Sequence, residues 1–220
     1  MSFRSFTAFF ALVCVQPAVA QTVAGRVEVI EKSGAKRESL EGILVYLDGV
    51  VAPIPDGLRS RSFTMTSRNK TFDPHVEVVP VGSTVTFPNV DDIMHNVFSL
   101  SRGNRFDLGL YKSGAKKDVV FENPGLVRVY CNIHPQMSGF IQVMSSPYFG
   151  LASPDGGFRL DGIPPGSYTL AVWHEEGETS RPIVVTENGA RDIVIELDVS
   201  DFKKRPHLNK FGKPYKRGKY

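Results

Sequence analysis

A short loop of soft metal-ligand residues between two strand-like runs constrains this chain more than any other feature. Cys131, His134 and Met137 follow one another at three-residue spacing. The segments 127–130 and 140–143 bracket this loop, and both alternate in the way that strands do. We expect the two segments to pair, so that the loop between them is held at both ends.

The loop offers the ligands expected for copper, since thiolate, imidazole and thioether are the soft and intermediate donors that this metal prefers. A further ligand must come from elsewhere, and His95 lies upstream between two other strand-like runs. Together, Cys131, His134, Met137 and His95 would form a site with two histidines, one cysteine and a weak axial methionine. This is the ligand set of a single type 1, or blue, copper centre.

Neighbours of these ligands have predicted supporting roles. Asn96 directly follows His95 and is placed to hydrogen-bond across to the ligand loop, although an ordinary polar loop residue is an equal alternative. Pro135 would stiffen the loop and keep a backbone donor away from the metal. Met94, Ile133 and Pro135 are predicted to form an apolar rim around the exposed edge of His134, where a partner could dock.

The N-terminal segment 1–20 has the layout of a secretory signal peptide, with one basic residue, an apolar run and small residues before Gln21. Its cleavage would place the protein in the periplasm and remove Cys14. Cys131 would then be a lone thiol in an oxidising compartment. A buried, inert cysteine is the simpler alternative, but it does not explain His134 and Met137 beside it. We expect no transmembrane segment elsewhere in the chain.

Charge is distributed unevenly along the chain. The full sequence has a formal net charge of +3, while residues 203–220 hold eight Lys or Arg and no acidic residue. We predict that 201–220 is a basic, disordered tail. Alternatively, the tail contacts an anionic membrane surface or an acidic partner. Nucleic acid is not an expected partner of a secreted protein.

The remaining pattern predicts an all-β protein with two β-sandwiches. Strand-like runs and short turns over 62–145 favour a Greek-key sandwich that carries the copper ligands. Segments 21–61 and 146–200 are each too small for a core of their own, so we expect them to form one flanking sandwich into which the copper domain is inserted. Alternatively, the N-terminal strands pack on the copper domain. Asn188-Gly189 predicts a hairpin late in the flanking sandwich.

The chain resembles the cupredoxins at the residues named above. The spacing of Cys131, His134 and Met137 looks like the short ligand loop of the amicyanin and plastocyanin-like members, and segments 81–87 and 94–97 are similar to the matching family segments. The resemblance implies a cupredoxin domain with one type 1 copper site. Ile133 departs from amicyanin, which has proline there.

The flanks resemble the carboxypeptidase-regulatory or transthyretin-like sandwich. The segments that carry this resemblance are 25–27, 45–47, 155–160 and 164–170. The combination of both domains is similar to bacterial methylamine-utilisation-type proteins, which implies a periplasmic location and an amine-oxidation partner.

The leading hypothesis is a periplasmic blue copper protein, not an enzyme, that transfers single electrons between partners such as a dehydrogenase, a cytochrome or an oxidase. One alternative is a copper carrier or buffer without redox turnover, and another is an adhesion module with a vestigial site. A second histidine cluster is missing from the sequence, which argues against a multicopper enzyme. A single mature cysteine argues against a binuclear copper site.

Overall fold

The structure is a computed structural model that describes residues 20–32, 37, 40–203 and 206–215. The predicted signal peptide, residues 1–20, lies outside the described residues except for its last position. Residues 204–205 and 216–220 of the predicted tail also lie outside them. No helix among the described residues has the length and apolar character needed to span a membrane.

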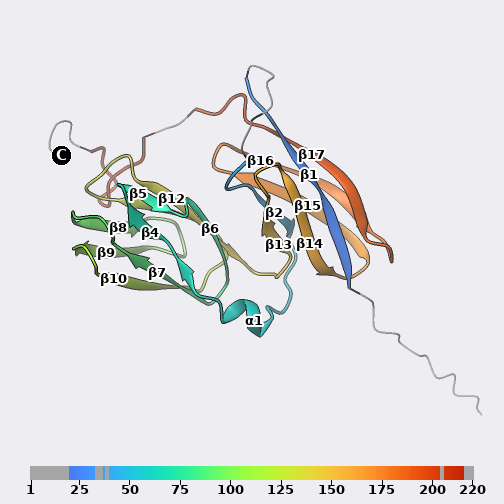
Figure 1. Cartoon of the computed structure of the whole chain (residues 1–220), viewed down its shortest axis with the longest axis horizontal. Coiled ribbons are helices and arrows are strands. Elements are labelled where there is room, and N and C mark those ends of the chain that lie inside the picture. Colours follow the sequence, from blue (N-terminus) through green and yellow to red (C-terminus); the bar gives the residue numbers. More distant parts are fainter. Residues whose placement is uncertain (1–19, 33–36, 38–39, 204–205, 216–220) are drawn as a thin grey trace, which may run out of the picture.

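The described chain is built almost entirely of strands, as the all-β prediction requires (Figure 1). The strands of the first and last parts are β1 (Gln21–Ile30), β2 (Leu44–Asp48), β13 (Phe149–Leu151), β14 (Gly157–Ile163), β15 (Gly166–His174), β16 (Gly177–Val185) and β17 (Ala190–Asp198). Those of the middle part are β3 (Phe63–Thr64), β4 (Thr66–Arg68), β5 (Thr71–Asp73), β6 (Val76–Pro80), β7 (Ser83–Pro88), β8 (His95–Ser99), β9 (Phe106–Tyr111), β10 (Lys116–Phe121), β11 (Gly125–Cys131) and β12 (Ser138–Met144). One short helix, α1 (Asp56–Arg59), lies in the connection between β2 and β3.

The first and last strands form one unit, which we call the flanking sandwich. One of its sheets has the order β14-β1-β17, and the other has the order β13-β2-β15-β16. β1 pairs in parallel with β17, although the two strands come from opposite ends of the described chain. Valine, leucine and isoleucine side chains from both sheets fill a common core.

The middle strands form the central sandwich. Its larger sheet has the order β6-β12-β11-β8-β9, its smaller sheet has the order β10-β7-β3, and β4 and β5 form a separate hairpin. The core between these sheets includes Phe87, Phe121 and Val129, and it also contains Cys131 and Met137. The large aromatic side chains therefore fill the body of the sandwich, and the sulfur-bearing side chains lie in the same apolar interior.

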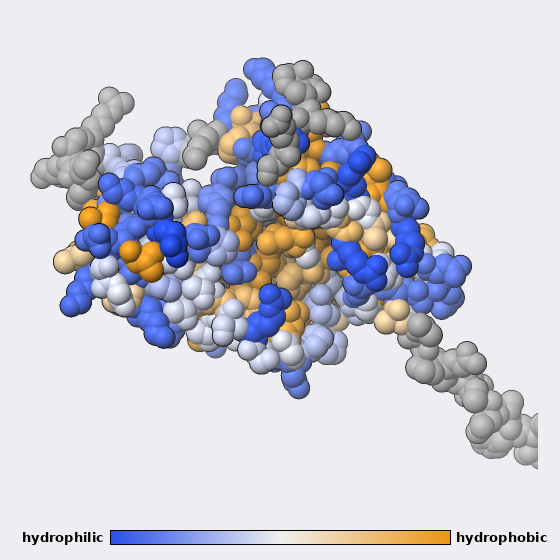
Figure 2. All heavy atoms as spheres, in the orientation of Figure 1, coloured by the Kyte–Doolittle hydropathy of each residue, from blue (hydrophilic) through white to orange (hydrophobic). Residues whose placement is uncertain are grey.

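The two sandwiches lie side by side and share a small apolar junction (Figure 1). Phe140 of β12 packs edge-on against Trp173 of β15, with ring centroids 5.5 Å apart. His75 and Glu175 form a polar contact of 2.9 Å across the same junction. Figure 2 shows apolar residues gathered over the middle of this face of the molecule. The domain limits 21–61, 62–145 and 146–200 stay predictions.

The predicted hairpin at Asn188-Gly189 is wrong at the level of sheet pairing. Thr186 and Gly189 do close a tight turn through their backbone groups. The strands on either side then enter different sheets, because β17 pairs with β1 and β16 pairs with β15. Gly25 of β1 permits this arrangement, since a Cβ there would lie 2.0 Å from the carbonyl oxygen of Ile193.

We expect Gly25→Ala to lower the free energy of unfolding by about 2 kcal/mol or more, because a methyl group cannot fit against a backbone carbonyl without moving β17. Urea denaturation followed by the fluorescence of Trp173, the single tryptophan, measures this change. Gly57→Ala is the matched control, since a Cβ at Gly57 meets nothing within 4 Å. Equal stability of the two variants would contradict the close approach of β1 and β17.

Candidate metal centre

The pairing of two strands brings the first two candidate ligands together. His95 is the first residue of β8 and Cys131 is the last residue of β11. These strands are antiparallel, with Tyr130 opposite Phe98 and Cys131 opposite Val97. Both candidate ligands have no exposed surface. The strand register therefore fixes a buried thiol and a buried imidazole side by side at one end of the larger sheet.

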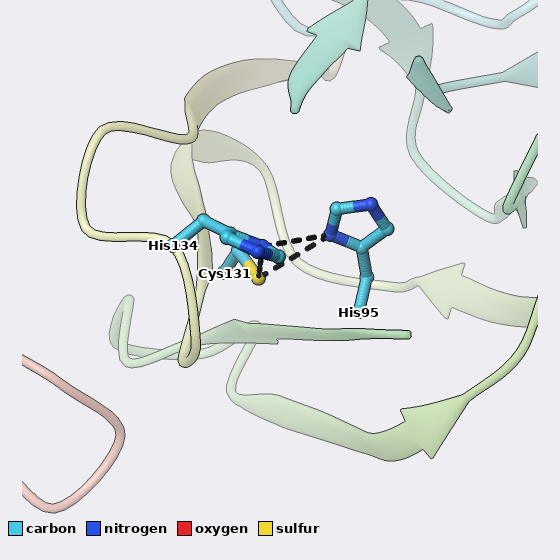
Figure 3. A group of neighbouring side chains, drawn as sticks. All are labelled: His95, Cys131 and His134. Atoms are coloured by element: carbon cyan, nitrogen blue, oxygen red, sulfur yellow. Dashed lines mark hydrogen bonds between the residues drawn. The ribbon is translucent and has the colours of Figure 1, made fainter. Parts of the chain in front are cut away.

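The ligand loop adds His134 to this pair (Figure 3). The Sγ atom of Cys131 lies 3.7 Å from Nδ1 of His95 and 3.6 Å from Nδ1 of His134. The two Nδ1 atoms are 3.2 Å apart. Donors about 2.0 Å (nitrogen) and about 2.3 Å (sulfur) from one metal ion lie roughly 3.3–3.7 Å apart when three of them surround it. The triangle therefore has the dimensions that three ligands of one metal ion require.

A carboxylate fixes the imidazole of His95. Nε2 of His95 donates a hydrogen bond of 2.8 Å to Asp91, which orients the ring so that Nδ1 faces Cys131 and His134 and can bind a metal ion once it carries no proton. Lone pairs of sulfur and nitrogen then converge on one point, and only a proton or a cation between them makes this arrangement favourable. A metal ion satisfies all three donors at once.

Asp91 is itself held in place. Its carboxylate accepts backbone hydrogen bonds from Asn69 and Lys70, two residues with positive φ at the tip of the β4–β5 hairpin. Burial raises the pKa of Asp91, but the hydrogen bonds from Lys70, His95 and Asn69 outweigh it and lower the pKa below its ordinary value. Asp91 therefore stays ionised and orients His95. Sequence reasoning missed this residue, although its position four residues before His95 was a usable signal.

The environment of Cys131 favours a thiolate. Burial raises the pKa of the thiol. Hydrogen bonds from His95 and from the backbone N–H groups of Asn96, Ile133 and His134 have the opposite and larger effect, so the net pKa is below its ordinary value. The pKa of His95 is raised overall: burial lowers it, and the contacts with Cys131 and Asp91 more than compensate. Burial and the nearby charge of His95 lower the pKa of His134. These shifts favour the metal-binding forms of Cys131 and His134, whereas a metal ion has to displace the proton that His95 holds more tightly.

The ligand loop is closed by its own backbone. The N–H of Cys131 donates to the carbonyl of Met137 at 3.3 Å, and the N–H of Met137 donates to the carbonyl of His134 at 3.0 Å. The side chain of Met137 is fully buried in the same apolar cluster as Cys131. The structure thus brings His95, Cys131 and His134 together and places Met137 in the same interior. The axial role of Met137 stays a prediction.

Asn96 links the two ligand-bearing segments, but through its backbone. Its carbonyl accepts a hydrogen bond of 2.9 Å from the N–H of Asn132 in the ligand loop. Its side chain points elsewhere and donates to Asp107 at 2.6 Å. The backbone of Asn96 therefore links the two segments, while its side chain binds Asp107. A supporting role of Asn96 at the metal stays a prediction. Pro135 lies exposed in the loop.

The three residues predicted as an apolar rim surround the outer edge of the site. Met94, Ile133 and Pro135 line a shallow hollow of about 460 Å³ together with His134 and Ile93. Met94 is 55% exposed. The hollow leaves the edge of one candidate ligand beside an apolar surface, while the other ligands remain buried.

Comparison with solved structures finds cupredoxins and a copper-containing enzyme that are similar to part of this chain. No family model matches the sequence, and no match was found among the curated proteins. A purple cupredoxin from Nitrosopumilus maritimus is 25% identical over 38% of this chain and all of that chain, with a TM-score of 0.35. A copper-containing nitrite reductase from Thermus scotoductus is 28% identical over 44% of this chain, with a TM-score of 0.37, but only 24% of that enzyme is covered. A copper(I) form of an amicyanin variant is 21% identical over 38% of this chain and 82% of that chain, with a TM-score of 0.36.

We expect Asp91→Asn to weaken metal binding by about tenfold or more, because the loss of a carboxylate behind a histidine ligand typically lowers affinity 10- to 100-fold. A competition titration with a chromophoric chelator measures the change. Asp92→Asn removes a neighbouring exposed carboxylate and should bind the metal as the unmodified protein does. Equal weakening in both variants would show that general surface charge, and not the orientation of His95, is what matters.

Proposed function

We propose that this chain is a type 1 copper protein that transfers single electrons between partner proteins. The observation that carries the proposal is the triangle of one cysteine sulfur and two histidine nitrogens, with donor atoms 3.2–3.7 Å apart. The likeness of the ligand spacing to amicyanin points in the same direction.

The choice of copper rests on the donor set. A tetrahedral zinc site has similar dimensions, so distances alone do not select the metal. One thiolate, two imidazoles and a thioether nearby are the combination of type 1 copper, whereas structural zinc sites are completed by further cysteines or histidines. Among the described residues, His95, Cys131 and His134 are the one group of its kind. Copper bound here would supply a one-electron redox couple.

The residues of the chain supply rigidity and shielding. His95 is fixed by Asp91, and Cys131 is fixed by the ladder between β8 and β11. The buried positions of His95, Cys131 and Met137 exclude water from the inner side of the site. A set of ligands that moves little between two charge states keeps the reorganisation of the site small. These properties suit electron transfer and leave little room for a bound substrate.

The hollow beside His134 is the proposed docking surface for redox partners. Met94, Ile133 and Pro135 give it an apolar character, and a weak apolar contact suits a partner that must bind and leave quickly. We propose dehydrogenases, cytochromes or oxidases as partners. We further propose a periplasmic location, as the pattern of residues 1–20 predicts. In this proposal the protein is an electron carrier and not an enzyme.

Addition of Cu(II) to the purified mature protein tests the proposal. We expect an intense visible thiolate-to-copper band and reversible voltammetry, and we expect Cys131→Ser to abolish the band because serine cannot supply a thiolate. Zn(II) added at equal concentration serves as a spectroscopically silent competitor. A protein that binds only Cu(I) and stays colourless would contradict electron transfer and favour the copper carrier. A protein that binds neither form would indicate a vestigial site.

A second variant tests the role of Met137. We expect Met137→Leu to keep the thiolate-to-copper band and to change the reduction potential, because the axial ligand tunes the potential without forming the main bonds. Met144→Leu is the matched control, since Met144 is also buried but lies in the junction between the sandwiches. An unchanged potential in Met137→Leu would remove Met137 from the ligand set.

A further inference from the structure

Residues 206–215, which belong to the predicted tail, make specific contacts with the central sandwich. After β17 the chain leaves the flanking sandwich and returns to the central sandwich, where the described residues 206–215 lie (Figure 1). These residues fold into a compact turn around Asn209. Its side-chain oxygen accepts hydrogen bonds from the N–H groups of Phe211 and Lys213, and its N–H donates to the carbonyl of Lys213 at 2.8 Å. We call residues 206–215 the C-terminal strap.

The strap contacts two consecutive residues of the ligand loop. The hydroxyl of Tyr215 donates a hydrogen bond of 2.8 Å to the carbonyl of Cys131. The backbone N–H of Lys210 donates to the side-chain oxygen of Asn132 at 3.0 Å. The strap therefore holds the loop where β11 ends and the ligands begin.

A second connection reaches the segment that carries the other histidine. The ammonium group of Lys210 lies 2.8 Å from the carboxylate of Asp107. The same carboxylate accepts the hydrogen bond from the side chain of Asn96, which directly follows His95. The backbone carbonyl of Asn96 in turn accepts a hydrogen bond from the N–H of Asn132 in the ligand loop. Lys210 thus joins both ligand-bearing segments in one network of hydrogen bonds.

Aromatic stacking anchors the strap on the residue before Cys131. The ring of His207 stacks on Tyr130 with centroids 4.0 Å apart and an angle of 14° between the planes. His207 also meets the edge of the Tyr215 ring at 5.2 Å. The contacts of Tyr215 and Lys210 therefore belong to a docked segment and not to isolated side chains that touch the surface.

We propose that the C-terminal strap is a positioning element of the metal centre, in which Tyr215 and Lys210 hold the ligand loop in its metal-binding conformation. The proposal rests on the copper function proposed above. Neither residue touches the metal donors. They act through the carbonyl of Cys131, the side chain of Asn132 and the carboxylate of Asp107. Removal of either contact should loosen the loop without removing a ligand.

The test uses full-length Tyr215→Phe, which deletes one hydroxyl. Tyr168→Phe is the matched control, because the hydroxyl of Tyr168 also donates to a backbone carbonyl, that of Pro164, but does so in the flanking sandwich. In the metal-free protein we expect the amide hydrogens of residues 131–134, 136 and 137 to exchange about fivefold faster in Tyr215→Phe, the factor expected for one lost hydrogen bond. In the copper-loaded protein we expect loss of copper to a chelator to be about tenfold faster.

Lys210→Ala should act in the same direction, with Lys213→Ala as its control, because Lys213 is an exposed neighbour in the same turn. Faster exchange and faster copper loss in Tyr215→Phe and Lys210→Ala, with rates unchanged in the controls Tyr168→Phe and Lys213→Ala, support the proposal. Rates equal to those of Tyr168→Phe overturn it, and so does faster exchange with unchanged copper loss. If the unmodified protein takes up no copper, the function proposed above fails. Amide exchange in the metal-free protein then tests the role of the strap by itself, and an exchange rate that Tyr215→Phe leaves unchanged overturns that role.

Discussion

The antiparallel pairing of β8 with β11 is the constraint on which the rest of the structure depends. It places His95 at the start of one strand beside Cys131 at the end of the other, in an interior closed to water. The ligand loop that follows is short and closed by its own hydrogen bonds, and it directs the imidazole of His134 toward Cys131 and His95. A shift of one residue in this register would turn one of the two buried ligands away from the site.

The electrostatics of the site follow from this geometry. A thiolate in an apolar interior is costly unless neighbouring donors stabilise it, and His95 with three backbone N–H groups supply them. The carboxylate of Asp91 accepts a hydrogen bond from Nε2 of His95 and so orients the ring with Nδ1 toward Cys131 and His134. The charged and polar groups lie in a row, from the largely buried carboxylate of Asp91 through the imidazole of His95 to the buried sulfur of Cys131. Such a site is stable only with a cation or a shared proton at its centre.

The sequence predicted the parts of this arrangement that depend on local pattern. Strand-like alternation marked the strands, and the spacing of Cys131, His134 and Met137 indicated a ligand loop that needed a further ligand. His95 was the candidate, and the structure places it beside Cys131 and His134. The missed features are long-range. The turn at Asn188 is a local signal, but the next strand pairs with β1 from the other end of the described chain, where Gly25 permits the close approach. Asp91 lies only four residues before His95, but the hairpin tip that holds its carboxylate comes from a distant segment. Tyr215 lies in a segment whose basic composition gave no sign of its contact with Cys131.

Identification of the atoms bound to copper tests the central claim most directly. X-ray absorption spectroscopy of the copper-loaded mature protein resolves the donor atoms by element. The account predicts one short bond to sulfur, from Cys131, and two bonds to imidazole nitrogen, from His95 and His134. In Cys131→Ser the short sulfur bond should disappear. A copper ion surrounded only by nitrogen and oxygen in the unmodified protein would contradict the account.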